Sequence, residues 1–363
     1  MKRLLLLLAL LPALLHAQKS PVDYVNPFIG TTNFGTCNPG AVMPAGLMSV
    51  VPFNVMGSDL NAFDKDARWW STPYEETNSF FTGYSHVNLS GVGCPDLSSL
   101  LLMPTSGELD VDYHNYGSTY SDEKATPGRY SNRLTKYGIK TEVSATLRTS
   151  IARFVYPKGQ GNVLLNLGEG LTNESGAFVR YVNDCEVEGQ KMLGGFCYNS
   201  PHAWYPCYFV LRVSKKPQSR GFWKLQRAAY GVEKERNPEA GKYKLYKNYR
   251  RDLGGDDIGA YWTFDCADGE EVEVRMGVSF VSIANARENL DAEQPVGTHF
   301  DDIALQARKA WEQALSTVTV EGGTEDQRTI FYTALYHLQI HPNILQDVNG
   351  QYPAMEGEEI LQT

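Results

Sequence analysis

The sequence predicts a mainly β protein in which a large antiparallel β-sandwich is followed by helices. Between about residues 107 and 281, short runs of alternating apolar and polar residues recur between Gly, Asn and Asp turn signals. Many short strands separated by such turns are typical of sandwiches. After residue 284 the apolar spacing changes from two to three and four, the period of an amphipathic helix. The length of 363 residues is enough for two domains.

The first residues predict export. Lys2 and Arg3 precede an apolar run from Leu4 to Leu15, and the small residue Ala17 follows this run. That order is typical of a secretory signal peptide, to which we assign residues 1–17. The run is too short to span a bilayer, and no later stretch is long and apolar enough to do so. We therefore expect an exported protein, periplasmic or extracellular, with no membrane span.

Charge and cysteine usage argue against two classes of protein. The chain has 33 Lys and Arg residues against 42 Asp and Glu, so its formal charge is -9 at pH 7. Nucleic-acid binding needs a basic surface, and this balance argues against it. The 6 cysteines permit disulfides in an exported chain, but free buried thiols are equally compatible and the spacing selects no pairing. No two cysteines have the Cys-x-x-Cys spacing that zinc sites use.

The sandwich is expected to begin after a long ordered loop that extends to residue 46 and is rich in Gly, Pro and Asn. Apolar or alternating runs then predict strands at Leu47–Phe53, Leu100–Met103, Ile139–Leu147, Thr149–Tyr156, Gly161–Leu167, Cys207–Val213, Ala260–Phe264 and Glu271–Val281. The polar stretch from residue 215 to 251 fits either a hairpin extension or an insertion.

Helices are predicted in roughly the last eighty residues of the chain. The predicted elements are helices Ala286–Ala292 and Phe300–Leu315, a short strand Thr317–Val320, and a helix that Thr324 and Gln327 open as a capping box and Pro342 ends. The last helix carries Ile330, Phe331, Ala334, Leu335 and Leu338 on one face. A single amphipathic helix cannot bury its apolar face alone, so we expect further helices after Thr363.

The stretch from Gly83 to Pro104 has the composition of a functional loop. It places His86, Cys94 and several small polar residues ahead of an apolar strand. Trp69 and Trp70 belong to an aromatic group just upstream. Polar groups beside aromatic faces suit a sugar, which has hydroxyls on its edge and C–H groups on its face. The alternative is a Gly-rich connection beside core aromatics.

Other hydrolytic chemistry stays open at this point. Cys94 and His86 are the residue types of a thiol nucleophile and its base, which keeps a thiol-dependent hydrolase as one alternative. A glycosidase needs two carboxylates on opposite sides of the scissile bond, and no spacing selects a pair among 42 acidic residues.

Several separated segments form an ordered set: Val25–Thr31, Pro39–Ala41, Pro44–Leu47, Gly83–His86, Leu89–Gly93, Leu101–Pro104, Gly277–Ala286, Phe331–His337, Pro342-Asn343 and Asp347–Tyr352. Together they resemble glycoside hydrolase family 92, a family of exo-acting α-mannosidases. Three features depart from the family pattern: Ala45 stands where many members carry Phe, Cys94-Pro95-Asp96 differs from the usual sequence, and the segment from Lys215 to Arg251 has no counterpart in the family.

The resemblance implies a β-sandwich domain at residues 18–285 and a helical linker at 286–322. Residues 323–363 would then begin a truncated (α/α)6 catalytic barrel. It also implies a calcium-dependent, inverting exo-α-mannosidase acting on mannose-containing glycans, with α-1,2 the expected linkage. The catalytic acid, the base and the Ca2+ ligands would lie mainly beyond Thr363, so none is assigned here, and we expect the chain alone to be inactive.

By the same resemblance, the sandwich lends loops to the pocket for the terminal sugar. The matching residues are Trp69, Trp70, His86 and Cys94, and Asp347 resembles a sugar-contacting aspartate of the family. The alternative function is a non-catalytic glycan-binding β-sandwich module. That alternative predicts sugar binding without calcium and without hydrolysis.

Overall fold

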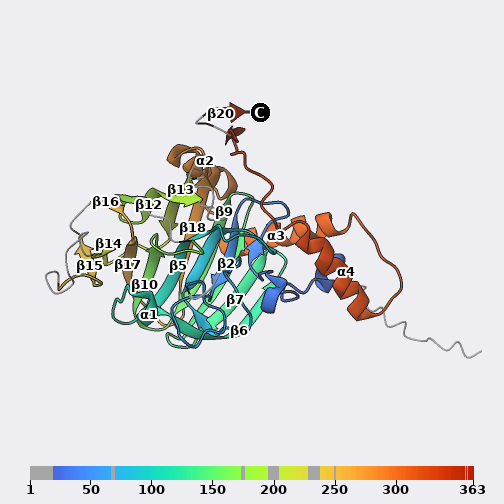
Figure 1. Cartoon of the computed structure of the whole chain (residues 1–363), viewed down its shortest axis with the longest axis horizontal. Coiled ribbons are helices and arrows are strands. Elements are labelled where there is room, and N and C mark those ends of the chain that lie inside the picture. The colour runs from blue at the N-terminus through green and yellow to red at the C-terminus, as the bar shows by residue number, and fades with distance from the viewer. Residues whose placement is uncertain are drawn as a thin grey trace, which may run out of the picture.

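The computed structural model describes residues 19–66, 70–172, 176–194, 204–227, 238–248, 251–355, 357 and 359–363. The predicted signal peptide lies outside these residues. Two large antiparallel sheets pack face to face, and helices follow the sandwich (Figure 1). The predicted mainly β sandwich is confirmed. Within the described ranges no helix has the length and apolar character needed to cross a bilayer.

The first sheet has eight strands in the described chain, and all its neighbouring pairs are antiparallel. In spatial order they are β1 (Ala41–Val42), β2 (Ser49–Phe53), β4 (Gly83–Asn88), β5 (Leu97–Ser106), β10 (Gly159–Asn166), β17 (Ile258–Cys266), β14 (Ser219–Leu225) and β15 (Tyr243–Lys247). The β14–β15 pair lies within the stretch from 215 to 251 and is a hairpin at the sheet edge. Residues 228–237 between these strands lie outside the described ranges.

The second sheet has ten strands in the described chain, again paired antiparallel. In spatial order they are β16 (Asp252–Gly255), β11 (Ala177–Asn183), β12 (Glu186–Gly194), β13 (Trp204–Val213), β18 (Glu270–Ser279), β9 (Thr149–Tyr156), β8 (Ile139–Ala145), β7 (Arg129–Leu134), β6 (Ser118–Thr126) and β3 (Phe80–Phe81). A separate two-stranded sheet joins β19 (Gln351–Pro353) to β20 (Ile360–Gln362).

The core lies between the two sheets because successive side chains of a strand point to opposite faces. On β9, Ala152 and Phe154 belong to the main core cluster, whereas Ile151 packs on the other face. Buried tyrosines also join the sheets through their hydroxyls. The Tyr181 hydroxyl on β11 donates to the Tyr261 carbonyl on β17 at 2.7 Å. Such bonds satisfy polar atoms that would be costly to bury alone.

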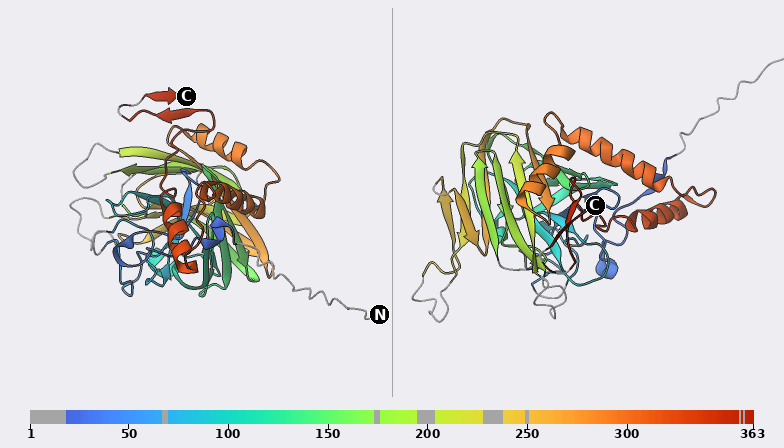
Figure 2. Two further views of the ribbon diagram at one scale, coloured as in Figure 1. Left: turned by 90° about the vertical axis from the view of Figure 1, so that its right-hand side faces the viewer. Right: turned by 90° about the horizontal axis from the view of Figure 1, so that it is seen from above.

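The helices are α1 (Tyr113–Tyr116), α2 (Ile283–Glu293), α3 (Phe300–Leu315) and α4 (Glu325–His337), with 3-10 turns η1 (Pro21–Tyr24) and η2 (Asn33–Gly35). Helices α2 and α3 cover the face of the ten-stranded sheet that points away from the sandwich core (Figure 2). The bounds of α3 agree with the prediction. The predicted capping box of Thr324 and Gln327 is present at the start of α4.

Two local predictions are wrong. Residues 317–320 form no strand, because their backbone groups bond to the Tyr332 side chain instead of to another strand. Val320 N donates to the Tyr332 hydroxyl, and this hydroxyl donates to the Val318 carbonyl, each at 3.3 Å. Helix α4 ends at His337, five residues before Pro342. The chain then crosses back toward the sandwich, where Ala45 N donates to the Gln339 carbonyl at 2.7 Å.

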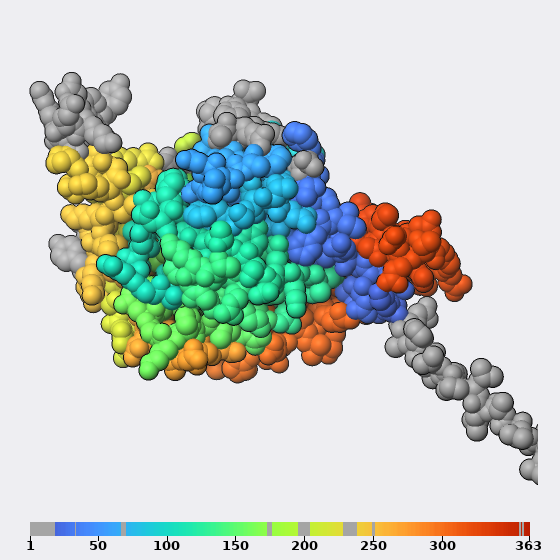
Figure 3. Space-filling view, turned by 90° about the horizontal axis from the view of Figure 1, so that it is seen from below, coloured from blue at the N-terminus to red at the C-terminus, as the bar shows by residue number. Residues whose placement is uncertain are grey.

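Helix α4 buries the face opposite to its most apolar one. Tyr332 and Tyr336 are buried, while Ile330 and Leu338 are exposed. The buried face packs against the N-terminal segment: Tyr24 stacks on Tyr332 with ring centroids 5.7 Å apart. Asn26 N donates to Thr333 Oγ1 at 2.9 Å. Figure 3 shows α4 beside the blue N-terminal segment, standing out from the body of the sandwich.

The stretch from Gly83 to Pro104 is mostly strand rather than loop. Strands β4 and β5 take both of its ends, and only residues 89–96 connect them. Its small polar residues suggested a loop, but inside the sheet they make hydrogen bonds. Ser85 Oγ donates to the Val51 carbonyl at 3.2 Å, and Asn88 Nδ2 donates to the Ser49 carbonyl at 3.1 Å.

Candidate functional site

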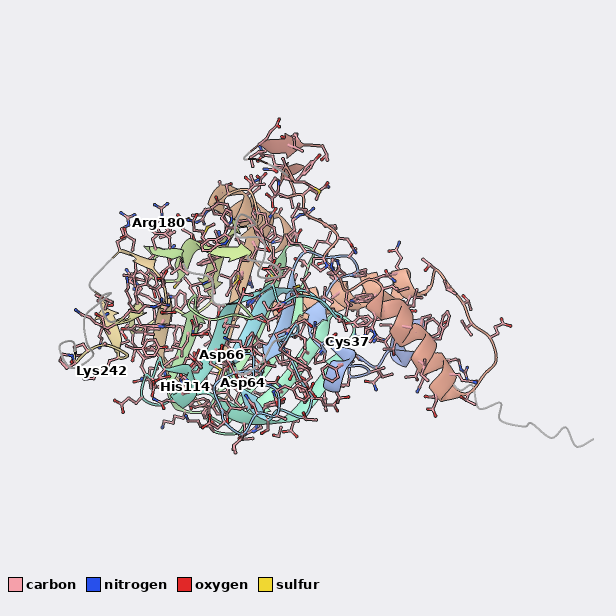
Figure 4. The ribbon with its side chains drawn as sticks, in the orientation of Figure 1. Cys37, Asp64, Asp66, His114, Arg180 and Lys242 are labelled. Atoms are coloured by element: carbon pink, nitrogen blue, oxygen red, sulfur yellow. The ribbon has the colours of Figure 1, made fainter. Side chains whose placement is uncertain are left out.

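Three loops meet at one edge of the sandwich, next to α4. We call residues 30–38, 70–78 and 89–96 the loop junction. Backbone hydrogen bonds tie them together: Glu76 N donates to the Thr31 carbonyl, and Gly91 N donates to the Thr36 carbonyl, both at 3.0 Å. The first loop also reaches α4, because the Cys37 sulfur lies 3.9 Å from His337 Nδ1. Figure 4 shows Cys37 beside this helix.

An aromatic stack fills one side of the loop junction. Trp69 lies outside the described residues, and Trp70 is only 3% exposed. The Trp70 ring packs against Phe63 at 4.5 Å and against Phe34 at 6.2 Å between centroids. Phe34 is the exposed member of the stack, with 77% of its surface accessible. The aromatic surface predicted for Trp70 is therefore presented by Phe34, which the sequence reasoning missed.

Polar atoms without partners lie in the same loop. Trp70 Nε1, Ser71 Oγ and Thr72 Oγ1 are buried, and none has a hydrogen-bond partner among the described residues. Most buried polar groups in proteins are hydrogen-bonded to protein or water, so three consecutive exceptions mark an unusual segment. Their chemistry suits acceptors such as hydroxyl oxygens.

Backbone strain is concentrated where β5 begins. Leu97, Ser98 and Leu100 have φ values of 59°, 48° and 53°. These values lie in the left-handed region, which residues other than glycine rarely adopt. Such strain persists only where the surrounding structure enforces it, and it clusters at ligand sites. Here the strained residues directly follow the loop 89–96.

His86 lies inside the first sheet rather than on a surface. It is 1% exposed on β4, and its Nδ1–H donates to the Leu100 carbonyl at 2.7 Å. Burial lowers its pKa to about 4, so the ring is neutral at pH 7. In this conformation the imidazole presents almost no surface to a ligand.

This burial predicts acid-sensitive stability. The unfolded chain, with a His86 pKa near 6.5, binds a proton that the folded chain resists down to about pH 4. The free energy of unfolding is therefore expected to fall by up to about 3 kcal/mol as pH falls from 6.5 to 4. Urea unfolding at a series of pH values measures this slope. His86→Asn keeps a donor for Leu100 and should flatten the slope, whereas His341→Asn, at an exposed site, should not. Equal slopes in wild type and His86→Asn would contradict the prediction.

Cys94 is part of a disulfide bond, whereas the other described cysteines, Cys37, Cys185, Cys207 and Cys266, are free. A disulfide sulfur cannot act as a thiolate nucleophile. The alternative of a thiol-dependent hydrolase built on Cys94 and His86 is therefore wrong for this structure. The bond instead fixes one end of the loop 89–96.

Asp347 lies away from the loop junction, packed against α2. It is 1% exposed, and its carboxylate accepts hydrogen bonds from Ser279 Oγ at 2.6 Å, Asn285 Nδ2 at 2.8 Å and Asn289 Nδ2 at 2.6 Å. Val348 N donates in turn to Asn289 Oδ1 at 2.9 Å. In this conformation the carboxylate holds the turn of residues 347–350 against the helix.

The structure thus brings together only some of the predicted site residues. Trp70 and the loop that carries Cys94 belong to the loop junction, His86 lies inside the sheet, and Asp347 packs against α2. The signal for Phe34 was present in the sequence: an aromatic residue inside a Gly- and Asn-rich loop. Their roles toward a sugar remain predictions.

Residues 24–279 match the family model described as the glycosyl hydrolase family 92 N-terminal domain. The chain belongs to glycosyl hydrolase family 92. Residues 285–362 match the model of the family's catalytic domain, so the two models meet just before α2. The predicted linker at 286–322 and barrel start at 323 stay predictions.

Solved structures of family 92 have the same fold. The GH92 α-mannosidase BT3965 from Bacteroides thetaiotaomicron is 26% identical, with a TM-score of 0.79 over 95% of this chain and 44% of that chain. The family GH92 inverting mannosidase BT2199 from the same organism is 23% identical, with a TM-score of 0.74 over 94% of this chain and 43% of its own. At that identity, the second likeness shows the fold alone.

A curated relative is also similar. A protein of Arthroderma benhamiae named an uncharacterized secreted glycosidase is 25% identical over 360 residues, which are 93% of this chain and 43% of the relative. The chain therefore spans less than half the length of the relatives it matches.

The family implies calcium, and the described residues do not supply a site for it. Among them, no three His, Cys, Asp or Glu side chains gather closely enough to hold a metal ion. The carboxylates at the loop junction have protein partners: Asp96 accepts from the Tyr205 hydroxyl at 2.9 Å, and Glu76 accepts from Thr31 Oγ1 at 2.8 Å. No catalytic step is assigned to a metal here.

Proposed function

We propose that this family 92 chain is the sandwich-bearing part of an exported exo-α-mannosidase. The enzyme would release terminal α-mannose from glycans, with α-1,2 the expected linkage. The observation that carries the proposal is the match of both family models, in order, to residues 24–362. Support comes from the relative BT3965, an α-mannosidase solved in complex with mannoimidazole, and from the relative named a secreted glycosidase.

The proposed chemistry is inversion by a general acid and a general base. These two carboxyl groups stand about 6.5–9.5 Å apart in inverting enzymes, which leaves room for the attacking water. We propose that both groups, and most of the Ca2+ ligands, come from the part of the catalytic domain that lies outside this chain. The described residues would position the sugar, and the loop junction would form one wall of its pocket.

The test compares residues 18–363 with the full-length enzyme on α-1,2-mannobiose in the presence of calcium. Residues 18–363 alone are expected to release no mannose. The full-length enzyme is expected to release mannose first as its β anomer, observed by proton NMR, and to lose activity on chelation until calcium is restored. Hydrolysis by residues 18–363, or an α anomer as first product, would contradict the proposal.

The exposed Phe34 ring supports a second candidate function, a glycan-binding module without catalysis. That function predicts that the full-length protein binds mannobiose after chelation and never hydrolyses it. Calorimetry with and without chelator, next to the activity assay, separates the two candidates.

A further inference from the structure

We propose that the outer face of the ten-stranded sheet carries a binding site for a phosphate or sulfate group, in a cavity formed by β6, β7 and β8. This inference does not depend on the proposed function. The cavity has a volume of about 420 Å³, which is within the range usual for small-molecule sites. Its charged lining residues are the basic Lys124, Arg129, Arg133 and Lys140 and the acidic Asp122 and Glu142. The chain as a whole has a formal charge of -9, so this concave surface has the opposite sign to the rest of the protein.

The register of the sheet brings the basic side chains together. Strands β6 and β7 are neighbours near one end of the sheet (Figure 1). Ser131 and Arg133 of β7 share the face that points away from the core, because alternate residues of a strand share a face. Lys140 of β8 stands directly opposite Arg133, and Lys124 of β6 stands directly opposite Ser131. Like charges directly opposite each other destabilise a sheet, and an oxyanion bound between them would replace this repulsion with attraction.

Glu142 does not neutralise the cluster, because its carboxylate already has a partner from outside the cavity. Arg153, which does not line the cavity, donates to Glu142 Oε2 from Nη2 at 2.8 Å and from Nε at 3.0 Å. Arg129 also bonds to this carboxylate. Within the part of the chain that the structure describes, Lys124 and Arg133 take part in no ion pair. These two cations are therefore available to a ligand.

A β-bulge in β6 shapes the open side of the cavity. The pairing of β6 with β7 shifts between Ser121 and Lys124, and Asp122 inside the bulge has a φ of 54°. Bulges bend a strand and re-aim its side chains, and they are frequent beside binding sites. Strand β3 pairs only with Ser118 and Thr119, so among the described strands none covers the outer edge of β6 beyond Thr119. The cavity lies at this open edge, which gives a ligand a way in.

The donor set fits a tetrahedral oxyanion. The guanidinium of Arg133 presents N–H groups in a fork that matches two oxygens of a phosphate or sulfate, and Lys124 adds a point charge. Ser131, which is half-buried between them, adds a hydroxyl donor. A neutral sugar would leave the cations without a counter-charge. A free ion and a phosphate or sulfate group carried by a sugar share this chemistry, and the volume of the cavity admits either.

The test titrates the full-length protein with inorganic phosphate by calorimetry, with the ionic strength held constant by NaCl. Two charged hydrogen bonds predict saturable binding with a Kd on the order of 1 mM or below. Arg133→Gln is expected to weaken this binding about tenfold and Lys124→Gln about fivefold, because each removes a charged donor. Lys158→Gln is the matched control, because it removes the same charge at an exposed site outside the cavity and should change Kd by less than about twofold.

Titrations with glucose 6-phosphate and with glucose distinguish the two sources of the group. Tighter binding of glucose 6-phosphate than of inorganic phosphate would assign the site to a group carried by a sugar, and equal binding would assign it to the free ion. Both results require that Arg133→Gln weaken the binding. Glucose, which has no charge, is expected not to compete with phosphate.

Thermal unfolding shows that a weaker affinity does not come from misfolding. Arg133→Gln relieves the repulsion with Lys140, so without phosphate its melting temperature is expected to equal or exceed that of wild type. Phosphate should raise the melting temperature of wild type more than that of Arg133→Gln. No saturable phosphate binding by the full-length protein, or equal Kd values for wild type and both cavity variants, would overturn the site.

Discussion

Replacing Trp311 with alanine is expected to lower the free energy of unfolding by about 3–5 kcal/mol. The Trp311 side chain is fully buried on α3, and its ring lies 4.5 Å from that of Tyr336 on α4. Its Nε1–H donates to the Val42 carbonyl at 2.6 Å. The alanine variant therefore loses packing, leaves a cavity and leaves a buried carbonyl without its donor.

Urea unfolding measures the global effect, and hydrogen exchange shows where the structure loosens. Exchange should rise first in α4 and η1, which share the Trp311 cluster. Trp204→Ala is the matched control, because Trp204 is about half exposed at the start of β13 and should cost less than about 1 kcal/mol. A Trp311→Ala cost no larger than that of the control would show that α4 is not held through this ring.

Replacing Asp347 with alanine is expected to cost about 2–4 kcal/mol, because it takes the acceptor from buried amides and a hydroxyl. Asn289 would keep its bond to the Val278 carbonyl at 2.8 Å, and Asn285 its bond to Gln351 at 2.9 Å, so the loss is partial. The turn of residues 347–350 should then separate from α2, with faster amide exchange at Val348.

Asp347→Asn is a sharper variant of the same test. It keeps the size of the side chain but, in either orientation, places an NH2 group where at least one donor already points, so we expect it to recover little stability. Asp265→Ala, at an exposed strand position, is the control and should change the free energy of unfolding by less than about 0.5 kcal/mol. Full stability of Asp347→Asn would contradict the hydrogen-bond account.

Local signals predicted the elements that depend on local sequence. The bounds of β9 and α3 agree with their predictions, because alternation and helical spacing are properties of a single segment. The capping box at Thr324 is likewise local. The buried face of α4 could not be predicted this way, since its partner is the segment near Tyr24, about three hundred residues earlier in the chain.

The candidate site was predicted less well, for a related reason. Composition marked residues 83–104 as polar, but it does not show that Ser85 and Asn88 have partners within a sheet. It showed two tryptophans, but not that Phe34 covers one of them. Nor could spacing show that Cys94 is bonded or that three side chains enclose Asp347. Each of these facts depends on chain segments that meet only in the folded protein.

The contact between the N-terminal segment and α4 has a consequence for the order of folding. The bond from Asn26 N to Thr333 closes a span of 307 residues. Contacts this distant in sequence form late, because closing so long a loop costs more entropy until shorter-range pairings have formed. The first folded residues of the mature protein therefore remain without their partner until nearly all of this chain has been delivered. In an exported chain, the segment around Asn26 crosses the membrane early but is among the last to reach its folded position. It stays accessible to chaperones and proteases until α4 has followed.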